Sequence, residues 1–353
     1  MVLETLQVVE MDPLKSSQEE WRRYHAFRKK RHVEKSPEDP FPSDENVEQI
    51  LKLQTQNSEF ETHFFTVLRE DNEIIGTLFY MIPLEGSTTF EGNMHICIFE
   101  IGILPEYRRK GIGRSLLRRA YDFGKANDRK VLVTSTDEPD GRAFLKAIGA
   151  QEALTGRESR LNMDKVDWNM VKEWAEEGLQ RNLNTKLTFV YRIPEEIIDE
   201  YSRVYTETNN QQPFGDLDIN AIITTPESIR KDEKDMAVLG RTWITAFTTE
   251  PDGKISGLTE INNLADRETI LIQRLTGVKQ EYRGRGLGKW LKAAMLLRIK
   301  EEFPKAKIIK TTNATTNAPM LSINTRMGFK LYKEGVNAQI TLDKLNEYLE
   351  KHN

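Results

Sequence analysis

EYRRKGIG, residues 106–113, recurs in this chain as EYRGRGLG at residues 281–288. The two copies start 175 positions apart (281 − 106), which is almost half of the 353 residues. Each copy follows an apolar run, residues 98–104 or 269–278, and each opens a segment whose apolar residues recur at helical spacing. The sequence therefore predicts a strand, a glycine loop and an amphipathic helix, present twice.

Both glycine loops have the chemistry of an anion-binding site. Gly111, Gly113, Gly286 and Gly288 let backbone N–H groups converge on an anion without a Cβ in the way. The helix that follows adds N–H donors without a partner inside the helix and a partial positive charge. The loops lack the third glycine of the dinucleotide fingerprint and the Gly-Lys-Ser/Thr of a Walker A loop. The spacing favours a loop that binds a pyrophosphate and belongs to neither of these two motifs. The alternative is that the glycines only shape a tight turn.

The elements around the two loops follow the same order in each half. A hairpin comes before the strand that enters the loop, and a strand and a short helix come after the loop helix. In the first half these are residues 63–68, 74–82, 130–135 and 141–147, and in the second they are 242–248, 255–261, 308–312 and 318–327. We expect the strands on either side of the loop helix to be parallel, because a crossover helix joins parallel strands.

The repeat predicts two domains, because 353 residues suffice for two cores of ordinary size. We assign residues 1–163 to the first module, 164–184 to a linker helix and 185–353 to the second module. Apolar residues recur at helical spacing in the linker, which favours a helix packed on a domain.

Composition excludes several classes of protein. The formal net charge is −4, so no positive field over the whole molecule favours nucleic acid. No apolar run approaches the length of a membrane span, and the single cysteine, Cys97, excludes an internal disulfide framework. The five histidines have no ligand spacing, so we expect no metal. A cytoplasmic protein is expected, with neither a membrane nor a nucleic acid as its partner.

Arg-x-x-Gly-x-Gly, entered from a strand through Glu-Tyr and followed by an amphipathic helix, resembles the acetyl-CoA loop of the GCN5-related N-acetyltransferases, the GNAT family. The resemblance covers nearly all of the chain as two tandem copies. It implies an α/β (α+β) fold of two tandem GNAT modules, each a mixed, twisted, mostly antiparallel sheet with helices on both faces.

The resemblance also implies acetyl-CoA (CoA) as the cofactor. In this family the strand before the loop splays from the next parallel strand, and the pantetheine arm lies in the gap, paired with strand backbone. The loop amides hold the pyrophosphate. The residues so implied are Ile101, Ile103, Arg108, Arg109, Lys110, Gly111, Ile112, Gly113 and Arg114 in the first copy, and Thr276, Val278, Arg283, Gly284, Arg285, Gly286, Leu287, Gly288, Lys289, Asn313 and Asn317 in the second.

The catalytic tyrosine of the family is absent from both halves. The family often has an Asn that contacts CoA and, seven residues later, a Tyr that acts as general acid. The second half has Asn317 and Asn324 at these positions, and the first half has Glu138 and Leu145. An Asn amide donates a hydrogen bond to a thiolate but cannot donate a proton as a phenol does. The second half keeps more of the pattern, which favours it as the catalytic unit with Asn324 at the acid position.

Two further features point to the second half. Residues 311–317, with Met320 and Asn324, resemble the C-terminal module of tandem acetyltransferases that include mycothiol synthase. Glu260, on a predicted strand near the substrate side, is our candidate for the general base, with Glu100 as its counterpart in the first half. The alternative for both carboxylates is a solvated or structural role.

We therefore expect an acyl-CoA-dependent N-acyltransferase. The expected reaction moves an acetyl group from acetyl-CoA to a primary amine of a small molecule, by direct transfer in a ternary complex. Two alternatives stay open: a non-catalytic CoA-binding or CoA-sensing protein, since both tyrosines are missing, and a peptide or protein N-acetyltransferase. The expected state is a monomer, as a pseudo-dimer of modules, or a homodimer.

Overall fold

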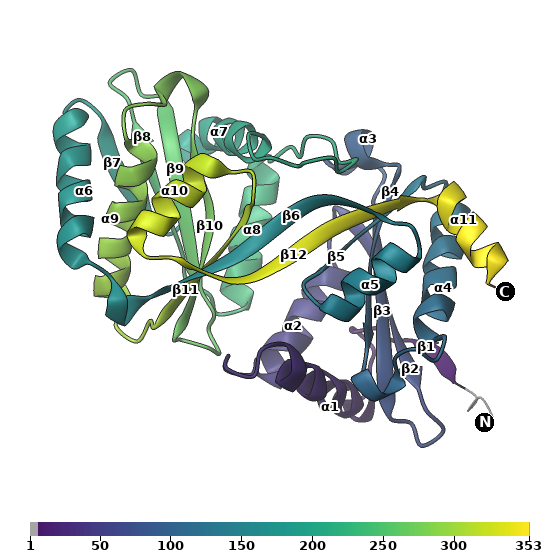
Figure 1. Cartoon of the computed structure of the whole chain (residues 1–353). Coiled ribbons are helices and arrows are strands. Elements are labelled where there is room, and N and C mark those ends of the chain that lie inside the picture. The colour runs from purple at the N-terminus through teal and green to yellow at the C-terminus, as the bar shows by residue number, and fades with distance from the viewer. Residues whose placement is uncertain (1–5, 353) are drawn as a thin grey trace. The chain divides into compact units, whose positions relative to one another are not determined.

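The computed structural model describes residues 6–352 of the chain. These residues form two compact units (Figure 1). Unit 1 comprises the residues up to Thr155, Gly215–Asn220 and the residues from Gly335 onwards. Unit 2 comprises Gly156–Phe214 and Ala221–Glu334.

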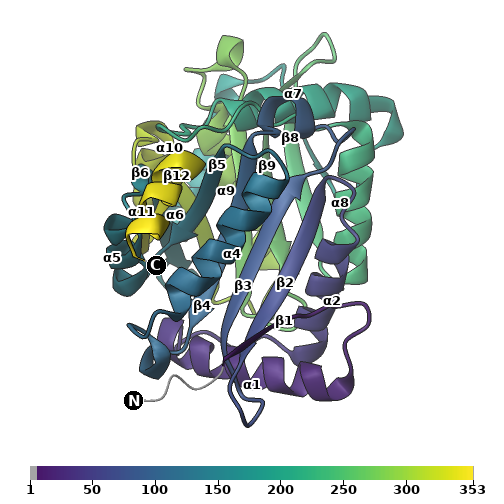
Figure 2. The ribbon, with the colours of Figure 1, turned by 90° about the vertical axis from the view of Figure 1, so that its right-hand side faces the viewer.

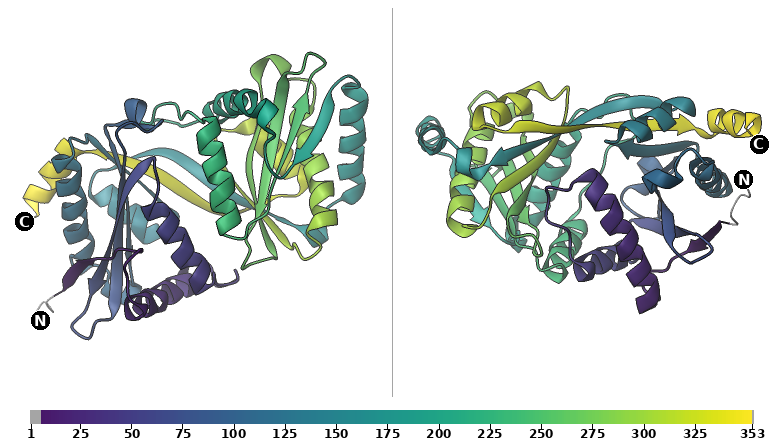
Figure 3. Two further views of the ribbon diagram at one scale, coloured as in Figure 1. Left: turned by 180° about the vertical axis from the view of Figure 1, so that it is seen from behind. Right: turned by 60° about the horizontal axis from the view of Figure 1, so that its bottom comes forward.

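The sheet of unit 1 is built mostly from the first half of the sequence. Its strands, in spatial order, are β1 (Gln7–Glu10), β2 (Phe60–Leu68), β3 (Ile74–Pro83), β4 (Ile96–Ile103), β5 (Val131–Thr136) and residues 335–341 of β12 (Lys330–Thr341). Its helices are α1 (Gln18–Lys35), α2 (Asp44–Thr55), α3 (Phe90–Asn93), α4 (Ile112–Ala126), α5 (Pro139–Ala147) and α11 (Leu342–Lys351), with the short 3-10 turn η1 (Pro105–Tyr107). Helix α4 covers one face of the sheet (Figure 2), and α1 and α2 cover the other (Figure 3).

The sheet of unit 2 has the same strand order, given from the opposite edge. Its strands are residues 156–162 of β6 (Gln151–Asn162), which corresponds to β12, then β11 (Ile308–Ala314), β10 (Ile270–Val278), β9 (Ile255–Asn263), β8 (Trp243–Thr249) and β7 (Lys186–Val190), which corresponds to β1. Its helices are α6 (Trp168–Arg181), α7 (Ile198–Asn210), α8 (Pro226–Val238), α9 (Leu287–Glu302) and α10 (Ala318–Met327), with the 3-10 turns η2 (Met163–Lys165), η3 (Glu195–Ile197) and η4 (Gln280–Tyr282). Helices α6 and α9 lie on one face of the sheet and α7 and α8 on the other (Figure 1).

One pair of strands in each unit is parallel, and it starts to separate after three residue pairs. In unit 1, β4 and β5 pair from Ile96↔Val131 to Ile98↔Val133. In unit 2, β10 and β11 pair from Ile270↔Ile308 to Ile272↔Lys310. The carboxyl ends of both strands lie beyond this pairing, so each glycine loop follows a strand that has left its parallel neighbour.

The mixed, mostly antiparallel sheets with helices on both faces confirm the predicted fold class. The units differ from the predicted ranges 1–163, 164–184 and 185–353, because strands β6 and β12 each run from one unit into the other. Helix α6, in the predicted linker, contributes Val171 and Trp174 to the core of unit 2. Helix propensity and periodicity are local, whereas the assignment of a strand to a sheet depends on its distant partners.

Across residues 6–352, no helix has the length and apolar character that crossing a membrane requires. The same residues contain no group of three or more His, Cys, Asp or Glu side chains that could hold a metal ion.

Candidate cofactor loops and transfer site

The backbone of both glycine loops turns through left-handed conformations into a helix. Gly111 (φ 84°) and Gly286 (φ 83°) precede the first residues of α4 and α9, and neither helix start has a side-chain cap. Other helices have one: Ser17 caps α1 and Asp167 caps α6. The N–H groups of the first turns of α4 and α9 are therefore left for an external anion.

The space around the second loop suits close approach of an anion to the backbone. A Cβ added at Gly284 (φ 81°) would meet nothing within 4 Å, and one at Gly286 would have only Arg181 Nη1 near it, at 3.9 Å. At Gly288 the neighbours would be Ile323 and Val278 side chains at 3.7 Å. Open glycines before an uncapped helix fit the pyrophosphate of CoA.

At one left-handed position, the first loop has a residue with a Cβ where the second has glycine. Arg109 (φ 60°) adopts the left-handed conformation that Gly284 adopts in the second copy. A residue with a Cβ pays about 1–2 kcal/mol in this region. The two loops thus share their path although their sequences differ at that position.

Basic side chains of the second loop are fixed by neighbours within unit 2. Arg283 donates from Nε to Val278 O at 3.3 Å and from Nη2 to the amide oxygen of Gln211. Arg285 donates to Asn182 Oδ1 (3.0 Å) and pairs with Glu250 (3.0 Å). The cation of Arg283 is thus held by neutral oxygens, while that of Arg285 is partly neutralised.

Strand β10 carries an irregularity beside the predicted base. Its pairing with β9 shifts register between Gln273 and Thr276, and Glu260 lies on β9 between the partners of these two residues, Ile261 and Thr259. A bulge of this kind re-aims backbone groups and is common next to active sites. No register shift interrupts the pairing of β3 with β4, the corresponding strands of unit 1.

Glu260 is buried in a polar cluster of unit 2, with 1% of the residue exposed. Its Oε1 accepts a hydrogen bond from Tyr201 of α7 at 2.6 Å, and its Oε2 lies 3.9 Å from Arg274 Nε. The Arg274 guanidinium stacks on the Trp243 ring, 4.6 Å from its centroid. Burial raises the pKa of Glu260 to about 7, an increase that Arg274 and Tyr201 partly offset. Such a carboxyl exchanges a proton near neutral pH, which is what general-base catalysis requires.

Of the Asn residues after the second loop, Asn313 lies on β11, Asn317 lies just before α10 and Asn324 lies on α10. Asn324 is 2% exposed, and its Nδ2 donates to Asn313 Oδ1 at 2.8 Å. Asn317 caps α10, accepting from the Met320 N–H at 3.4 Å. Asn324 is thus anchored to the strand that splays from β10, and it belongs to a different hydrogen-bonded group from Glu260.

The prediction that Glu100 is the counterpart of Glu260 is wrong. Gly76 pairs with Ile103 as Gly257 pairs with Val278, which puts Phe79 at the position of Glu260. Glu100 lies on β4, opposite Phe79. The two carboxylates lie on non-equivalent strands: Glu100 is on the loop strand β4, whereas Glu260 is on β9, the hairpin strand before the loop strand of its unit.

Sequence inspection missed Tyr201 and Arg274, which, with Tyr205 and Asp232, act on the carboxyl of Glu260. Tyr201 comes from α7, 59 residues before Glu260. The available signal was a pair of tyrosines, Tyr201 and Tyr205, at i, i+4 spacing, in a segment for which no helix had been predicted. Nothing in the sequence indicates that this helix packs over the carboxylate.

Sequence comparison finds a match to an acetyltransferase family in the first half of the chain. Residues 23–150 match the model of the acetyltransferase (GNAT) family. None of the curated proteins searched matches the chain.

Structural comparison extends the likeness to the whole chain. A tandem GNAT protein from the clavulanic acid biosynthesis pathway is similar with a TM-score of 0.74 and 19% identity, over 96% of this chain and 98% of that one. A GCN5-related N-acetyltransferase from Sphaerobacter thermophilus gives 0.62 and 14%, over 96% of both chains. N-myristoyltransferase of Saccharomyces cerevisiae, solved with myristoyl-CoA and inhibitors, gives 0.58 and 11%, over 96% of this chain and 81% of that one. The chain therefore carries a domain of the GNAT acetyltransferase family and has the fold of tandem GNAT proteins.

Proposed function

We propose that unit 2 moves an acetyl group from acetyl-CoA to a primary amine of a small molecule, by direct transfer in a ternary complex. The observation that carries the proposal is the arrangement in unit 2: an open glycine loop, a splayed strand with a bulge, and a buried carboxylate beside that bulge. The GNAT family and fold support acyl transfer, and the residues of unit 2 support its assignment to this half.

The residues that would hold CoA follow from the loop. Backbone N–H groups from Gly284 to Lys289 would bind the pyrophosphate, with Arg283 beside them. The backbone of Thr276 and Val278, beyond the last pair with β11, would bind the pantetheine amides. When bound, acetyl-CoA supplies the thioester whose carbonyl carbon the amine attacks.

Each side chain then has one task in the transfer. Glu260, as a carboxylate, accepts the proton that the amine nitrogen loses as the C–N bond forms. Tyr201 holds this carboxylate through its 2.6 Å hydrogen bond. Asn324, anchored by Asn313, offers an amide and no proton to the sulfur when the C–S bond breaks. The thiolate takes up one proton and Glu260 gives up one, so the reaction releases the N-acetyl product and CoA thiol in balance.

Thiol release tests the proposal. Full-length protein with acetyl-CoA and a panel of primary amines is expected to release CoA thiol only when both are present. Glu260→Gln should lower kcat/KM by about 100-fold or more, since a positioned base contributes about 10²–10⁴-fold. Glu268→Gln, which removes an exposed carboxylate paired with Lys305 in the same unit, is the control and should leave the rate unchanged.

Three results would overturn the proposal. CoA binding without thiol release from any amine would identify a CoA-binding protein. Release with peptides and with no small amine would identify a peptide acetyltransferase. Full activity of Glu260→Gln would remove the assigned base.

A further inference from the structure

We propose that carboxylates of unit 1 hold the first arginine of its glycine loop and so keep CoA from that loop, so that the chain binds one CoA, at the loop of unit 2. The inference concerns binding alone and holds whether or not unit 2 transfers an acetyl group.

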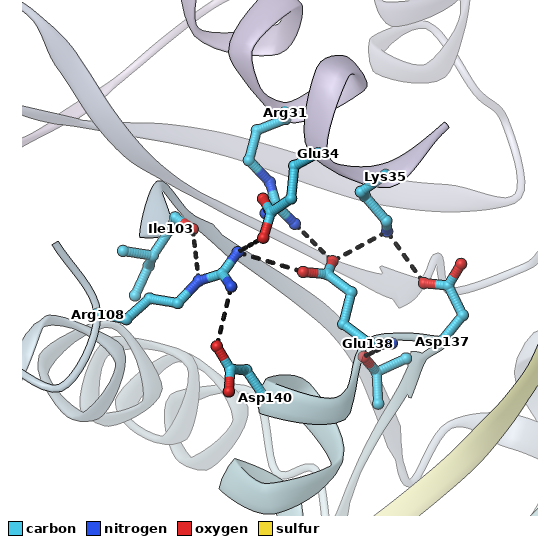
Figure 4. Close-up of polar contacts among 9 residues, drawn as sticks. Arg31, Glu34, Lys35, Ile103, Arg108, Asp137, Glu138 and Asp140 are labelled. Atoms are coloured by element: carbon cyan, nitrogen blue, oxygen red, sulfur yellow. Dashed lines mark hydrogen bonds and ion pairs between the residues drawn. The ribbon is translucent and has the colours of Figure 1, made fainter. Parts of the chain in front are cut away.

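Every guanidinium nitrogen of Arg108, the first arginine of the loop, already has an oxygen partner (Figure 4). Nε donates to Ile103 O at 3.1 Å, as Arg283 does to Val278 O in the second copy. Nη1 pairs with Asp140 at 3.0 Å, and Nη2 pairs with Glu34 at 2.6 Å and Glu138 at 3.3 Å. Carboxylates thus surround the cation that would otherwise face a pyrophosphate.

A second layer of cations holds these carboxylates in place. Arg31 and Lys35, in the last turns of α1, both pair with Glu138, and Lys35 also pairs with Asp137 at 3.2 Å (Figure 4). Glu138 precedes α5 but does not cap it with its side chain. Although burial raises the pKa of Glu138, the hydrogen bond from Arg31 and the charges around it hold that pKa below its ordinary value. Its carboxylate is therefore ionised at neutral pH.

The length of α1 brings this cluster to the loop. Helix α1 crosses strand β4 at Gly102, where the Phe27 side chain lies 3.7 Å from an added Cβ. Helix α7 crosses strand β10 at the matching glycine, Gly277, where its contact is Thr208. Helix α1 continues for eight residues beyond this point (35 − 27), whereas α7 continues for two (210 − 208). The six extra residues of α1 (8 − 2) carry Arg31, Glu34 and Lys35 to the end of the strand.

Among the described residues no carboxylate pairs with Arg283, the first arginine of the second loop, although Glu250 pairs with Arg285 and Glu177 with Lys289. The partner of Arg283 Nη2 is the neutral amide of Gln211, and Asn317 precedes α10 where Glu138 precedes α5.

The ion-pair network around Arg108 leaves no net positive charge on that side chain for an added anion, and Arg109, Lys110 and Arg114 of the same loop are not part of the network. The network has three cations (Arg31, Lys35, Arg108) and four carboxylates (Glu34, Asp137, Glu138, Asp140), a formal charge of −1 (3 − 4). A pyrophosphate that contacts Arg108 would have to displace these carboxylates or lie beside them. In the second case, its negative charge and theirs would repel each other.

Calorimetric titration of the full-length protein with CoA tests the inference. The wild-type chain is expected to bind one CoA. The variant Glu34→Gln/Glu138→Gln/Asp140→Asn removes the carboxylates from Arg108 and should bind two. The matched control Glu19→Gln/Glu61→Gln/Glu152→Gln removes as many paired carboxylates elsewhere in unit 1 and should bind one. Should the first triple variant unfold, Glu34→Gln/Asp140→Asn replaces it.

The outcomes separate this inference from the proposed function. Two CoA molecules per wild-type chain, or one that is lost with Gly111→Ala and kept with Gly286→Ala, would overturn it. A folded carboxylate variant that still binds one CoA would overturn it as well. No binding by the wild type would overturn both this inference and the proposed function, whereas one CoA bound at the loop of unit 2 without thiol release from any amine would refute transfer and leave this inference standing.

Discussion

At the scale of single residues, the buried carboxyl of Glu260 sets the pH range in which unit 2 can act. As a base it must be ionised, and its pKa of about 7 predicts that kcat/KM rises with pH through 7 and then levels. Tyr201→Phe removes the 2.6 Å hydrogen bond to the carboxylate, so this rise should move to higher pH. Rate profiles from pH 5 to 9 for both proteins measure the shift, and an unmoved profile would contradict the role of Tyr201.

The same pKa predicts a change in stability with pH. Because the pKa of Glu260 is raised on folding from 4.5 to about 7, the folded state binds its proton more tightly. The stability from this group is present below pH 4.5 and is lost as pH rises through 7. The wild type should therefore lose free energy of unfolding between pH 5 and pH 8, by up to about 3 kcal/mol at 1.36 kcal/mol per pKa unit, and Glu260→Gln should not show this loss. Urea unfolding at the two pH values checks this.

Lys292 of α9 is a buried amine that the proposed mechanism does not use. It is 2% exposed, its Nζ lies 5.2 Å from the centroid of the Phe329 ring, and burial lowers its pKa to about 7. Between pH 7 and 10.5 the Lys292 amine is protonated in the unfolded chain and neutral in the folded one. The free energy of unfolding should therefore rise with pH over this range. Lys292→Met should raise the free energy of unfolding at pH 7 by at least about 1 kcal/mol. Thermal unfolding, with the exposed Lys305→Met as control, measures it, and a lower Tm would refute the expectation.

At the scale of elements, the second glycine loop combines backbone strain with binding. Gly286→Ala places a Cβ at φ 83° and should cost about 1 kcal/mol of stability. Gly253→Ala, in the β8–β9 turn, is a matched control, because Gly253 has φ 86° and no atom within 4 Å of an added Cβ. Both variants should lose similar stability, while only Gly286→Ala should weaken CoA binding, by about tenfold or more. Equal affinities in the two variants would show that this loop does not bind CoA.

At the scale of the whole molecule, the two halves of the sequence are not two independent folding units. Unit 1 requires residues 335–341 of β12 and the buried Leu345 and Leu349 of α11, and unit 2 requires β6 and α6. Fragments 1–163 and 185–353 should therefore each lack a cooperative thermal transition, and their co-expression should restore one. Calorimetry on the fragments tests this, and a sharp transition with CoA binding by 185–353 alone would contradict it.

Much of the fold could be predicted from the sequence because its signals are local. The hairpins, the loop strands, the loop helices and the left-handed glycines Gly111 and Gly286 all follow from residues within a few positions of one another. Site residues formed by distant pairs could not be predicted in this way. Tyr201 reaches Glu260 across 59 positions, and Arg31 reaches Glu138 across 107.

By itself, the sequence determined that a strand, glycine loop and helix occur twice in the order of GNAT modules, since glycine spacing and apolar periodicity act within single elements. Only the tertiary structure decided that the two loops are unequal. Arg108 and Arg283 occupy matching positions, but α1 extends far enough to place carboxylates on Arg108, and α7 ends before it could do so for Arg283. The reason is physical: backbone geometry makes an anion cradle, whereas the charges that distant elements bring to it decide whether an anion can bind there.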